Sequence, residues 1–154
     1  MQKTLRYLED YPVGGSEEFG EIVVDADEIR DFASKWDPQP FHLGDGGGPE
    51  GPYGGLIASG WHTGVMVMKM LVTQGAISGE TSMGSPGLDI RWKAPVRPGD
   101  RLRAQLNITE NRPSQTKPDR GTLRFDCIVR NQNDEVVMTI DWVAIIRRRP
   151  PTSP

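Results

Sequence analysis

The sequence predicts an α+β fold, in which a strand and two helices precede a run of antiparallel strands. One apolar segment, near residues 60–73, carries helix-capping residues at both ends. Four later segments alternate apolar and polar residues, and Gly, Pro and Asn separate them. Helices and strands that are segregated along a chain are typical of the α+β class. With 154 residues the chain is long enough for one domain with a substantial core.

Composition and charge exclude several classes of protein. Hydrophobic residues make up 36% of the chain and charged residues 25%, as in soluble proteins. The net charge of −3 argues against a nucleic-acid surface as the main function. The single cysteine, Cys127, lies in an alternating apolar run, which indicates a core residue rather than a disulfide or metal ligand. Because the sequence shows neither a long apolar run nor a signal peptide, we expect a cytoplasmic protein.

The N-terminal part predicts an irregular arm over residues 1–18, a strand over residues 19–24 and then a helix. Asp25 as N-cap, with Glu28 three residues later, marks the helix start. The helix ends before Asp37, because that residue precedes a proline. Its apolar positions follow helical spacing, so we expect one packed face made of Ile29, Phe32, Ala33 and Trp36.

The stretch after this helix is stiff. Pro38 and Pro40 fix φ near about −65° and remove two backbone donors. Asp37 and Gln39 are therefore driven away from the helical region, and residues 36–42 predict an extended turn. Such a turn would hold Asp37 and His42 at a set separation, as a two-group acid–base site requires. An ordinary Asp-Pro turn with a solvated histidine fits the same residues.

A glycine-rich loop over residues 43–55 leads to the second helix. Its seven glycines and two prolines exclude a regular element, and both a functional loop and a plain insertion are compatible with it. Ser59 is a good N-cap, and Gly75 lies where a C-cap is expected about 14 residues on. Gly60, at the helix head, presents a backbone N–H that suits an anion or oxyanion.

The second half of the chain predicts four strands, over residues 87–92, 100–110, 121–131 and 135–147. The last strand has a wholly apolar face, made of Met138, Ile140, Trp142 and Ala144. One helix covers only part of such a sheet, so we expect a second copy of the chain to cover the rest. Residues 148–154 are basic and proline-rich, which predicts a disordered tail.

This order of elements resembles the hotdog fold, in which a curved antiparallel sheet wraps around one long central helix. Residues 37–42, Asp-Pro-Gln-Pro-Phe-His, resemble the Asp-x-Asn-Pro-x-His signature of MaoC-like dehydratases and R-specific enoyl-CoA hydratases. Ser59-Gly60 matches the glycine at the head of the hotdog helix, and residues 92–100 look like the family's strand-turn-strand. Gln39 replaces the usual Asn, and Ser59 stands where many members have His. The resemblance covers residues 19–147, which we expect to form a single domain.

The resemblance implies a hydratase or dehydratase that adds or removes water at the 2,3 double bond of an acyl thioester. The substrate would be 2-enoyl-CoA or (R)-3-hydroxyacyl-CoA, or the same acyl group on a carrier protein, with CoA as part of the substrate and no cofactor or metal. Asp37 and His42 would exchange protons with it, and the Gly60 N–H would stabilise an enolate-like oxyanion. The expected substrate-binding residues are Gln39, Phe41, Ser59 and Met68. Met66 and Met68 could line an acyl tunnel, but packing in the core is the favoured interpretation of these two residues.

Two other functions fit the same fold. A hotdog thioesterase would direct water at the carbonyl with a carboxylate, but it leaves the pairing of Asp37 with His42 unexplained. A non-catalytic acyl-thioester-binding protein would be favoured if these two side chains turned apart. We expect a homodimer or a dimer of dimers, with no nucleic-acid or membrane partner, and the glycine-rich loop reaching toward the neighbouring subunit.

Overall fold

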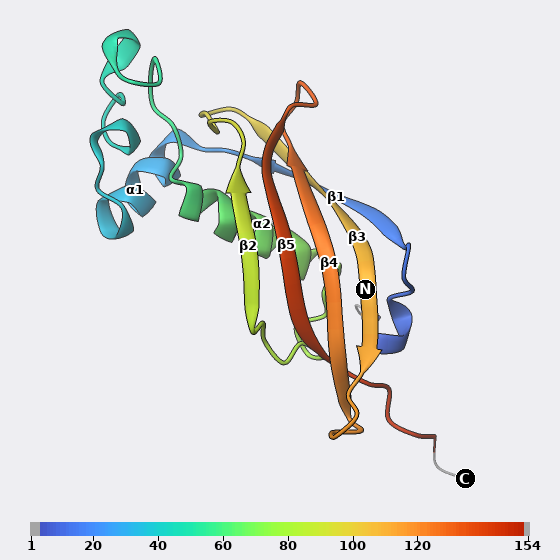
Figure 1. Cartoon of the computed structure of the whole chain (residues 1–154). Helices are drawn as coiled ribbons and strands as arrows, with labels where there is room; N and C mark the ends of the chain where they lie inside the picture. The colour runs from blue at the N-terminus through green and yellow to red at the C-terminus, as the bar shows by residue number, and fades with distance from the viewer. Residues whose placement is uncertain (1–3, 153–154) are drawn as a thin grey trace.

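The computed structural model describes residues 4–152 and contains one five-stranded antiparallel sheet with the strand order β1-β3-β4-β5-β2. Helix α2 crosses one face of this sheet, while α1 and the glycine-rich loop extend beyond it (Figure 1). The predicted α+β architecture is present, with both predicted helices, of which α2 lies against the sheet. The elements are β1 Ser16–Val23, α1 Ala26–Trp36, α2 Gly60–Thr73, β2 Gly87–Trp92, β3 Arg101–Pro113, β4 Arg120–Arg130 and β5 Val136–Arg147.

The predicted elements are confirmed with small shifts at their ends. Asp25 caps α1 by accepting a hydrogen bond from the Glu28 N–H at 3.0 Å, as the sequence indicates. Strand β1 begins before the predicted residue 19, because Ser16 already pairs with Asn107 of β3. The left-handed φ of +83° at Gly75 ends α2 where a glycine is expected.

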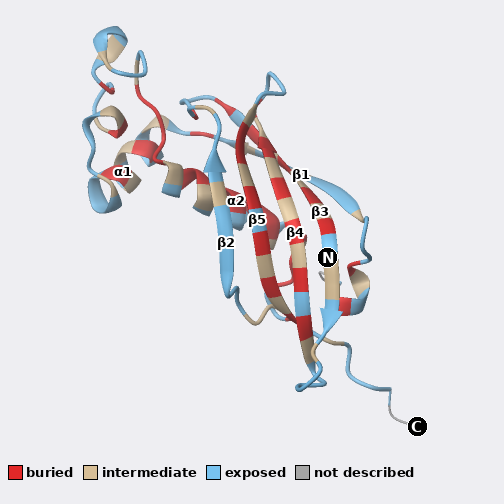
Figure 2. Ribbon diagram, in the orientation of Figure 1, coloured by how far each residue is buried: buried red, intermediate tan, exposed pale blue. Residues whose placement is uncertain are grey.

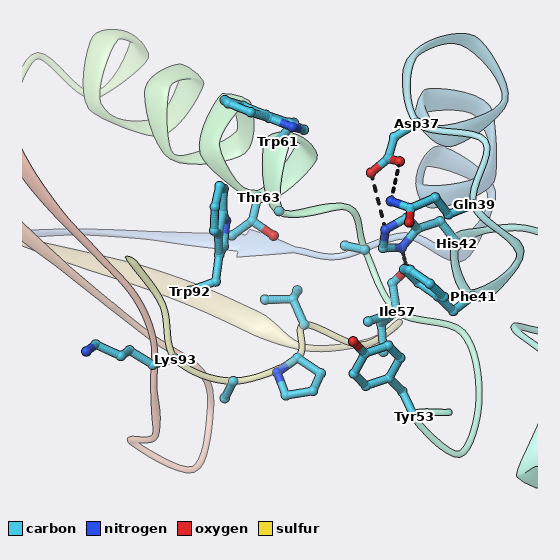
Figure 3. Close-up of a pocket in the computed structure, with 15 residues that line it drawn as sticks. Asp37, Gln39, Phe41, His42, Tyr53, Ile57, Trp61, Thr63, Trp92 and Lys93 are labelled. Atoms are coloured by element: carbon cyan, nitrogen blue, oxygen red, sulfur yellow. Dashed lines mark hydrogen bonds and ion pairs between the residues drawn. The ribbon is translucent and has the colours of Figure 1, made fainter. Parts of the chain in front are cut away.

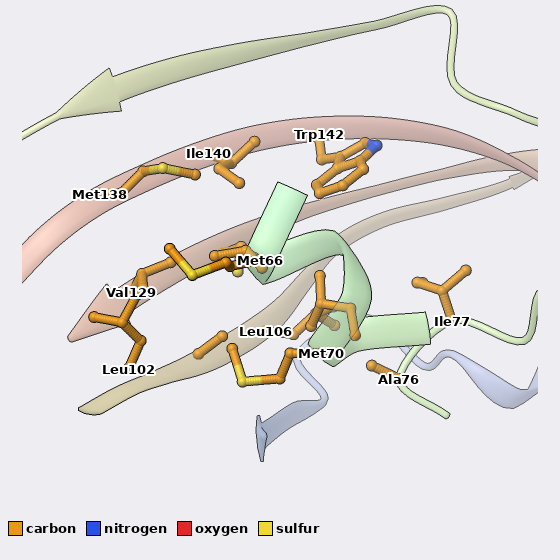
Figure 4. Close-up of a cluster of buried hydrophobic side chains, with 14 of the residues drawn as sticks. Met66, Met70, Ala76, Ile77, Leu102, Leu106, Val129, Met138, Ile140 and Trp142 are labelled. Carbon is orange, nitrogen blue, oxygen red and sulfur yellow. The ribbon is translucent and has the colours of Figure 1, made fainter. Parts of the chain in front are cut away.

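The core lies between α2 and the sheet. Side chains alternate between buried and less buried along the three central strands (Figure 2). The inward face of α2 presents Met66, Val67, Met70 and Leu71 to apolar side chains of β3, β4 and β5 (Figure 4). Cys127 is fully buried there, and burial raises the pKa of its thiol to about 12, as befits the predicted core residue.

The apolar face of β5 is covered within a single chain, which corrects our reason for expecting a second copy. Met138, Ile140, Trp142 and Ala144 are between 0% and 6% exposed. Helix α2, together with the segment that follows it, covers the face that we had expected to stay open. Large exposed apolar side chains are found instead on the outer side of α2, with Trp61, Val65 and Met68, and on β2, with Leu88 and Trp92.

Residues of the predicted arm and of the predicted tail contact the domain and one another. Leu8 and Tyr11 of the arm are buried in the core, and the Tyr11 hydroxyl donates to the Ala76 carbonyl at 3.0 Å. Arg148 and Arg149 of the tail pair with Glu9 and Asp10 of the arm. These ion pairs tie the start of the predicted tail to the domain. Residues 1–3 and 153–154 lie outside the described part of the chain.

One predicted core residue of α1 is exposed. Ile29 and Ala33 are fully buried, but Trp36 is 73% exposed. The last turn of α1 lies beyond the sheet (Figure 1), and the Trp36 side chain remains exposed to solvent. Within residues 4–152, neither helix has the length and apolar character needed to cross a membrane.

His62 joins the two helices. Its buried ring stacks on Phe32 of α1 at a centroid distance of 4.9 Å. Its Nδ1 is the one buried side-chain polar atom of residues 4–152 without a hydrogen-bond partner. Burial lowers the pKa of His62, against an upward pull from the Glu28 carboxylate. The folded protein therefore favours the neutral ring.

This lowered pKa predicts a loss of stability in mild acid. Below the unfolded-state pKa of about 6.5, the unfolded chain binds more protons than the folded one, so the free energy of unfolding falls as pH falls. We expect His62→Phe, which keeps an aromatic ring against Phe32, to flatten this dependence. Melting temperatures of both proteins between about pH 5 and pH 8 measure it. An unchanged acid dependence in the variant would assign the effect to other groups.

Candidate active site

A cleft of about 400 Å³ opens at the head of α2 (Figure 3). Its walls come from the turn after α1, the glycine-rich loop, the first turn of α2 and the end of β2 with the residues after it. Both Asp37 and His42 line it, as does Gly60. Its aromatic lining residues are Phe41, Tyr53, Trp61 and Trp92.

The turn between the helices places the acid and the base. The Asp37 N–H donates to the Ala33 carbonyl at 2.9 Å and closes α1, and Pro38 prevents further helix. Asp37 and Gln39 are non-helical, as their position before proline predicts. The prediction of a wholly extended turn was wrong for Pro40–His42, which form one 3-10 turn. The fixed φ of Pro40 suits the first position of such a turn.

Asp37 and His42 face one another within the cleft, as predicted. His42 Nε2 lies 3.3 Å from Asp37 Oδ2, and the two side chains are 5% and 16% exposed. His42 Nδ1 lies 2.8 Å from the Ile57 carbonyl oxygen, which can only accept. Nδ1 therefore carries a proton in either charge state of the ring, and Nε2 is the nitrogen that gains or loses one.

Two further side chains hold the Asp37 carboxylate. The Ser59 hydroxyl donates to Oδ2 at 2.7 Å, and the Gln39 amide donates to Oδ1 at 2.7 Å. Ser59 is fully buried and does not line the cleft, so the structure places it against Asp37 and not beside the predicted substrate-binding residues Gln39 and Phe41. Its oxygen also accepts no capping bond from the N–H groups of α2, since the side chain is turned toward Asp37. Gln39 lines the cleft as well as holding Asp37.

These contacts set the charge of Asp37. Burial alone would raise the pKa of its carboxyl, but the hydrogen bonds from Ser59 and Gln39 and the charge of His42 outweigh it. The pKa of Asp37 is therefore lowered, and the group is a carboxylate at neutral pH. A carboxylate next to an imidazole is an arrangement that can move protons in both directions.

Gly60 is the first residue of α2, so its N–H has no acceptor within the helix. A Cβ at this position would lie 2.4 Å from Trp92 Nε1, which explains the need for glycine. Trp92 in turn meets the Trp61 ring edge to face at 5.7 Å. The first residue of α2 therefore borders a cleft that has aromatic walls.

Sequence reasoning missed most of the aromatic lining. Phe41 was expected, and its ring packs edge-on against His42 at 4.5 Å and against Tyr53 at 5.3 Å. Tyr53 is held at the cleft because Arg97 donates to its carbonyl at 2.6 Å. The sequence did offer a signal for the other two aromatic residues. Trp61 directly follows Ser59-Gly60, and Trp92 is the first residue of the matching stretch 92–100.

Met68, one of the predicted substrate-binding residues, does not line the cleft that contains Asp37 and His42. It borders a second, mostly apolar cavity of about 240 Å³ between α2, the segment before β2 and the sheet. Met66 is a core residue, 4% exposed, whereas Met68 is 41% exposed.

Across residues 4–152, no group of three or more His, Cys, Asp or Glu side chains is arranged to hold a metal ion.

Comparisons with known proteins agree on one family. The sequence model of the MaoC like domain matches residues 11–131. A crystal structure of a MaoC-like dehydratase from Rhodospirillum rubrum is 36% identical, with a TM-score of 0.87, over 95% of this chain and 99% of that one. The R-hydratase PhaJ1 from Pseudomonas aeruginosa shares the fold at 20% identity, with a TM-score of 0.74 over 96% of both chains. The Bacillus subtilis protein YdeM is 24% identical over 92% of this chain and 99% of its own length.

We expect Ser59→Ala to raise the pKa of Asp37, because the variant removes a donor that stabilises the carboxylate. Carbon NMR titration of the Asp37 carboxyl measures this directly. Thr63→Ala is the matched control, since it removes a buried hydroxyl one turn along that bonds only the Ser59 carbonyl. If both variants titrated like the parent protein, the Ser59 hydroxyl would have no part in setting the charge.

Proposed function

This chain belongs to the MaoC-like domain family, and from that premise we propose that it is a hydratase or dehydratase acting on acyl thioesters, with 2-enoyl-CoA and (R)-3-hydroxyacyl-CoA as the substrate pair. The observation that carries the proposal is the contact between Asp37 and His42 at 3.3 Å, in a cleft that also contains the Gly60 N–H. The side chains do not turn apart, so the arrangement expected of a non-catalytic binding protein is absent.

The proposed reaction adds water across the double bond. The Asp37 carboxylate takes a proton from water while the water oxygen bonds the β-carbon. Negative charge moves to the thioester oxygen, where the Gly60 N–H donates to it; one such donor contributes roughly 3 kcal/mol in other enzymes. His42, protonated at Nε2, then delivers its proton to the α-carbon.

The direct contact between Asp37 and His42 allows their starting protonation states to be restored after each turnover. After one turnover, Asp37 holds the proton taken from water and His42 has lost its own. The proton passes from Oδ2 to Nε2 across the 3.3 Å contact, and the starting charges return. The Ile57 carbonyl supports this step, because it accepts from Nδ1 and keeps Nε2 pointed at Asp37. Elimination of water is the same path reversed.

The proposal also assigns binding places to the two ends of the substrate. Lys93, which lines the cleft, offers a positive charge to the phosphates of CoA or of an acyl carrier. The apolar cavity at Met68 is the candidate end for the acyl chain. We also expect a homodimer or a dimer of dimers, a cytoplasmic location, and no cofactor apart from the CoA of the substrate.

The first test is a panel of 2-enoyl-CoA esters, with loss of the absorbance of the conjugated double bond as the readout. We expect activity that falls by about 10²-fold or more in kcat in Asp37→Asn and His42→Ala, with a smaller change in KM. A thiol reagent in parallel detects free CoA. Release of CoA without loss of the double bond would replace this proposal with a thioesterase.

The oxyanion role of Gly60 is tested by comparing Gly60→Pro with Gly60→Ala. Both variants place a Cβ against the Trp92 ring, but only proline removes the N–H. Proline is tolerated at the first position of a helix, and Ser59 already has the extended ψ of 139° that precedes it. We expect kcat of the proline variant to lie about 10²-fold below that of the alanine variant. Equal rates would remove the N–H from the mechanism.

A further inference from the structure

The glycine-rich loop over residues 43–55 is folded on itself. The backbone N–H groups of Gly51 and Gly54 donate to the carbonyls three residues earlier, at 3.0 Å and 3.1 Å. The two ends of the loop also meet, because a Cβ on Gly46 would lie 2.6 Å from the backbone of Gly55. A compact loop with closed ends is a unit of its own, so its position depends on what ties it to the rest of the domain.

Two arginine side chains tie this loop to the domain. Near the start of the loop, Arg30 of α1 donates from Nε to the Gly44 carbonyl at 2.6 Å. Near its end, Arg97 donates from Nη2 to the Tyr53 carbonyl, also at 2.6 Å. The two bonds differ in what they hold, because Tyr53 lines the cleft and Gly44 does not. The bond from Arg97 is therefore the one that acts on the site.

The backbone of Arg97 is fixed on both sides. Its own N–H donates to one oxygen of the Asp100 carboxylate at 2.8 Å, and the other oxygen accepts from the Gln132 amide at 2.9 Å. Asp100 is buried. Directly before Arg97, the Val96 carbonyl accepts from the Ala58 N–H at 2.8 Å. The Arg97 side chain therefore extends to the loop from a part of the chain that is held in place.

The Tyr53 ring is part of the aromatic wall next to the catalytic pair (Figure 3). It meets the Phe41 ring edge to face at 5.3 Å, and Phe41 meets His42 in the same way at 4.5 Å. The His42 imidazole has its own polar contacts, with Asp37 and with the Ile57 carbonyl. A displacement of Tyr53 would therefore change the wall of the cleft while the two polar contacts of the base remain.

We propose that Arg97 is a positioning residue, which latches the glycine-rich loop to the opposite wall of the cleft and so fixes the Tyr53 ring where the acyl thioester binds. The inference rests on the proposed function for the identity of this ligand. Residues 92–96, directly before Arg97, line the cleft, so the latch joins two of its walls and sets how far they stand apart. Gly54 and Gly55, with φ of +68° and +141°, let the chain turn away directly after Tyr53.

The latch itself is tested by amide hydrogen exchange, measured by NMR, which needs no substrate. The Gly54 N–H follows Tyr53 directly and is bonded within the loop. We expect Arg97→Ala to speed its exchange by about tenfold, as the loss of one hydrogen bond predicts. Arg97→Lys keeps a donor on a long side chain and should retain most of the protection. Exchange in Arg97→Ala as slow as in the parent protein would overturn the latch.

The role of the latch in binding is tested with the 2-enoyl-CoA assay. We expect Arg97→Ala to raise KM by about fivefold or more and to leave kcat within about twofold, because the latch acts on binding and not on the chemical step. Arg30→Ala is the matched control, since it frees the Gly44 carbonyl of the same loop and leaves Tyr53 latched. Its KM should stay within about twofold of the parent value. Equal increases of KM in both variants would assign the effect to general loosening of the loop and would overturn the proposal.

A double-mutant cycle separates a positioning role from direct contact with the substrate. If Arg97 acts through the Tyr53 ring, Arg97→Ala has no further effect on KM once Tyr53→Ala has removed that ring. Additive effects of the two substitutions on KM would make Arg97 a direct ligand of the substrate and would overturn the positioning role. If the parent protein turned over no enoyl-CoA ester, the proposed function would fail, while faster exchange in Arg97→Ala would still support the latch.

Discussion

The hydrogen bond between Ser59 and Asp37 is the contact on which the site depends. It joins the C-terminal end of α1 to the N-terminal end of α2, at a distance of 2.7 Å. A carboxylate as sheltered as Asp37 pays a desolvation penalty unless donors surround it. Ser59, Gln39 and His42 supply those donors. The fold can therefore hold the ionised Asp37 carboxylate beside the His42 imidazole, at the point where the two helices meet.

The same bond also explains why the head of α2 is available to a substrate. Serine at an N-cap normally accepts from the second or third N–H of its own helix. Ser59 makes no such bond, because its hydroxyl is directed to Asp37. No side chain caps the first turn of α2 from this position, and Gly60 lines the cleft. One hydroxyl thus fixes the carboxylate and leaves the helix head open.

Local signals in the sequence were enough for the elements and for the main pair. Asp25 with Glu28, and Pro38 after Asp37, set the ends of α1 through backbone chemistry that neighbouring residues decide. The spacing of Asp37 and His42 around two prolines left few conformations, so their contact could be predicted. Ser59 was placed correctly as the residue before α2, but its partner is 22 residues away in the sequence. Propensity rules do not contain that information.

The wrong predictions about burial share one cause. Periodicity identifies the apolar face of a helix or strand, but it does not show which other element covers that face. Trp36 completes an apolar helical face, yet α1 ends beyond the sheet and the ring stays exposed. The apolar face of β5 was predicted to be open, yet α2 covers it.

Helix α2 shows the opposite discrepancy, because its sequence predicts more burial than a single chain provides. Its sequence is apolar nearly all round, which predicts burial on most of its surface. One chain buries the face with Met66 and Met70 but leaves Trp61, Val65 and Met68 exposed. Soluble proteins rarely keep such a stripe in water, particularly beside an open strand. The burial of α2 in a single chain therefore does not account for the apolar character of this side of the helix.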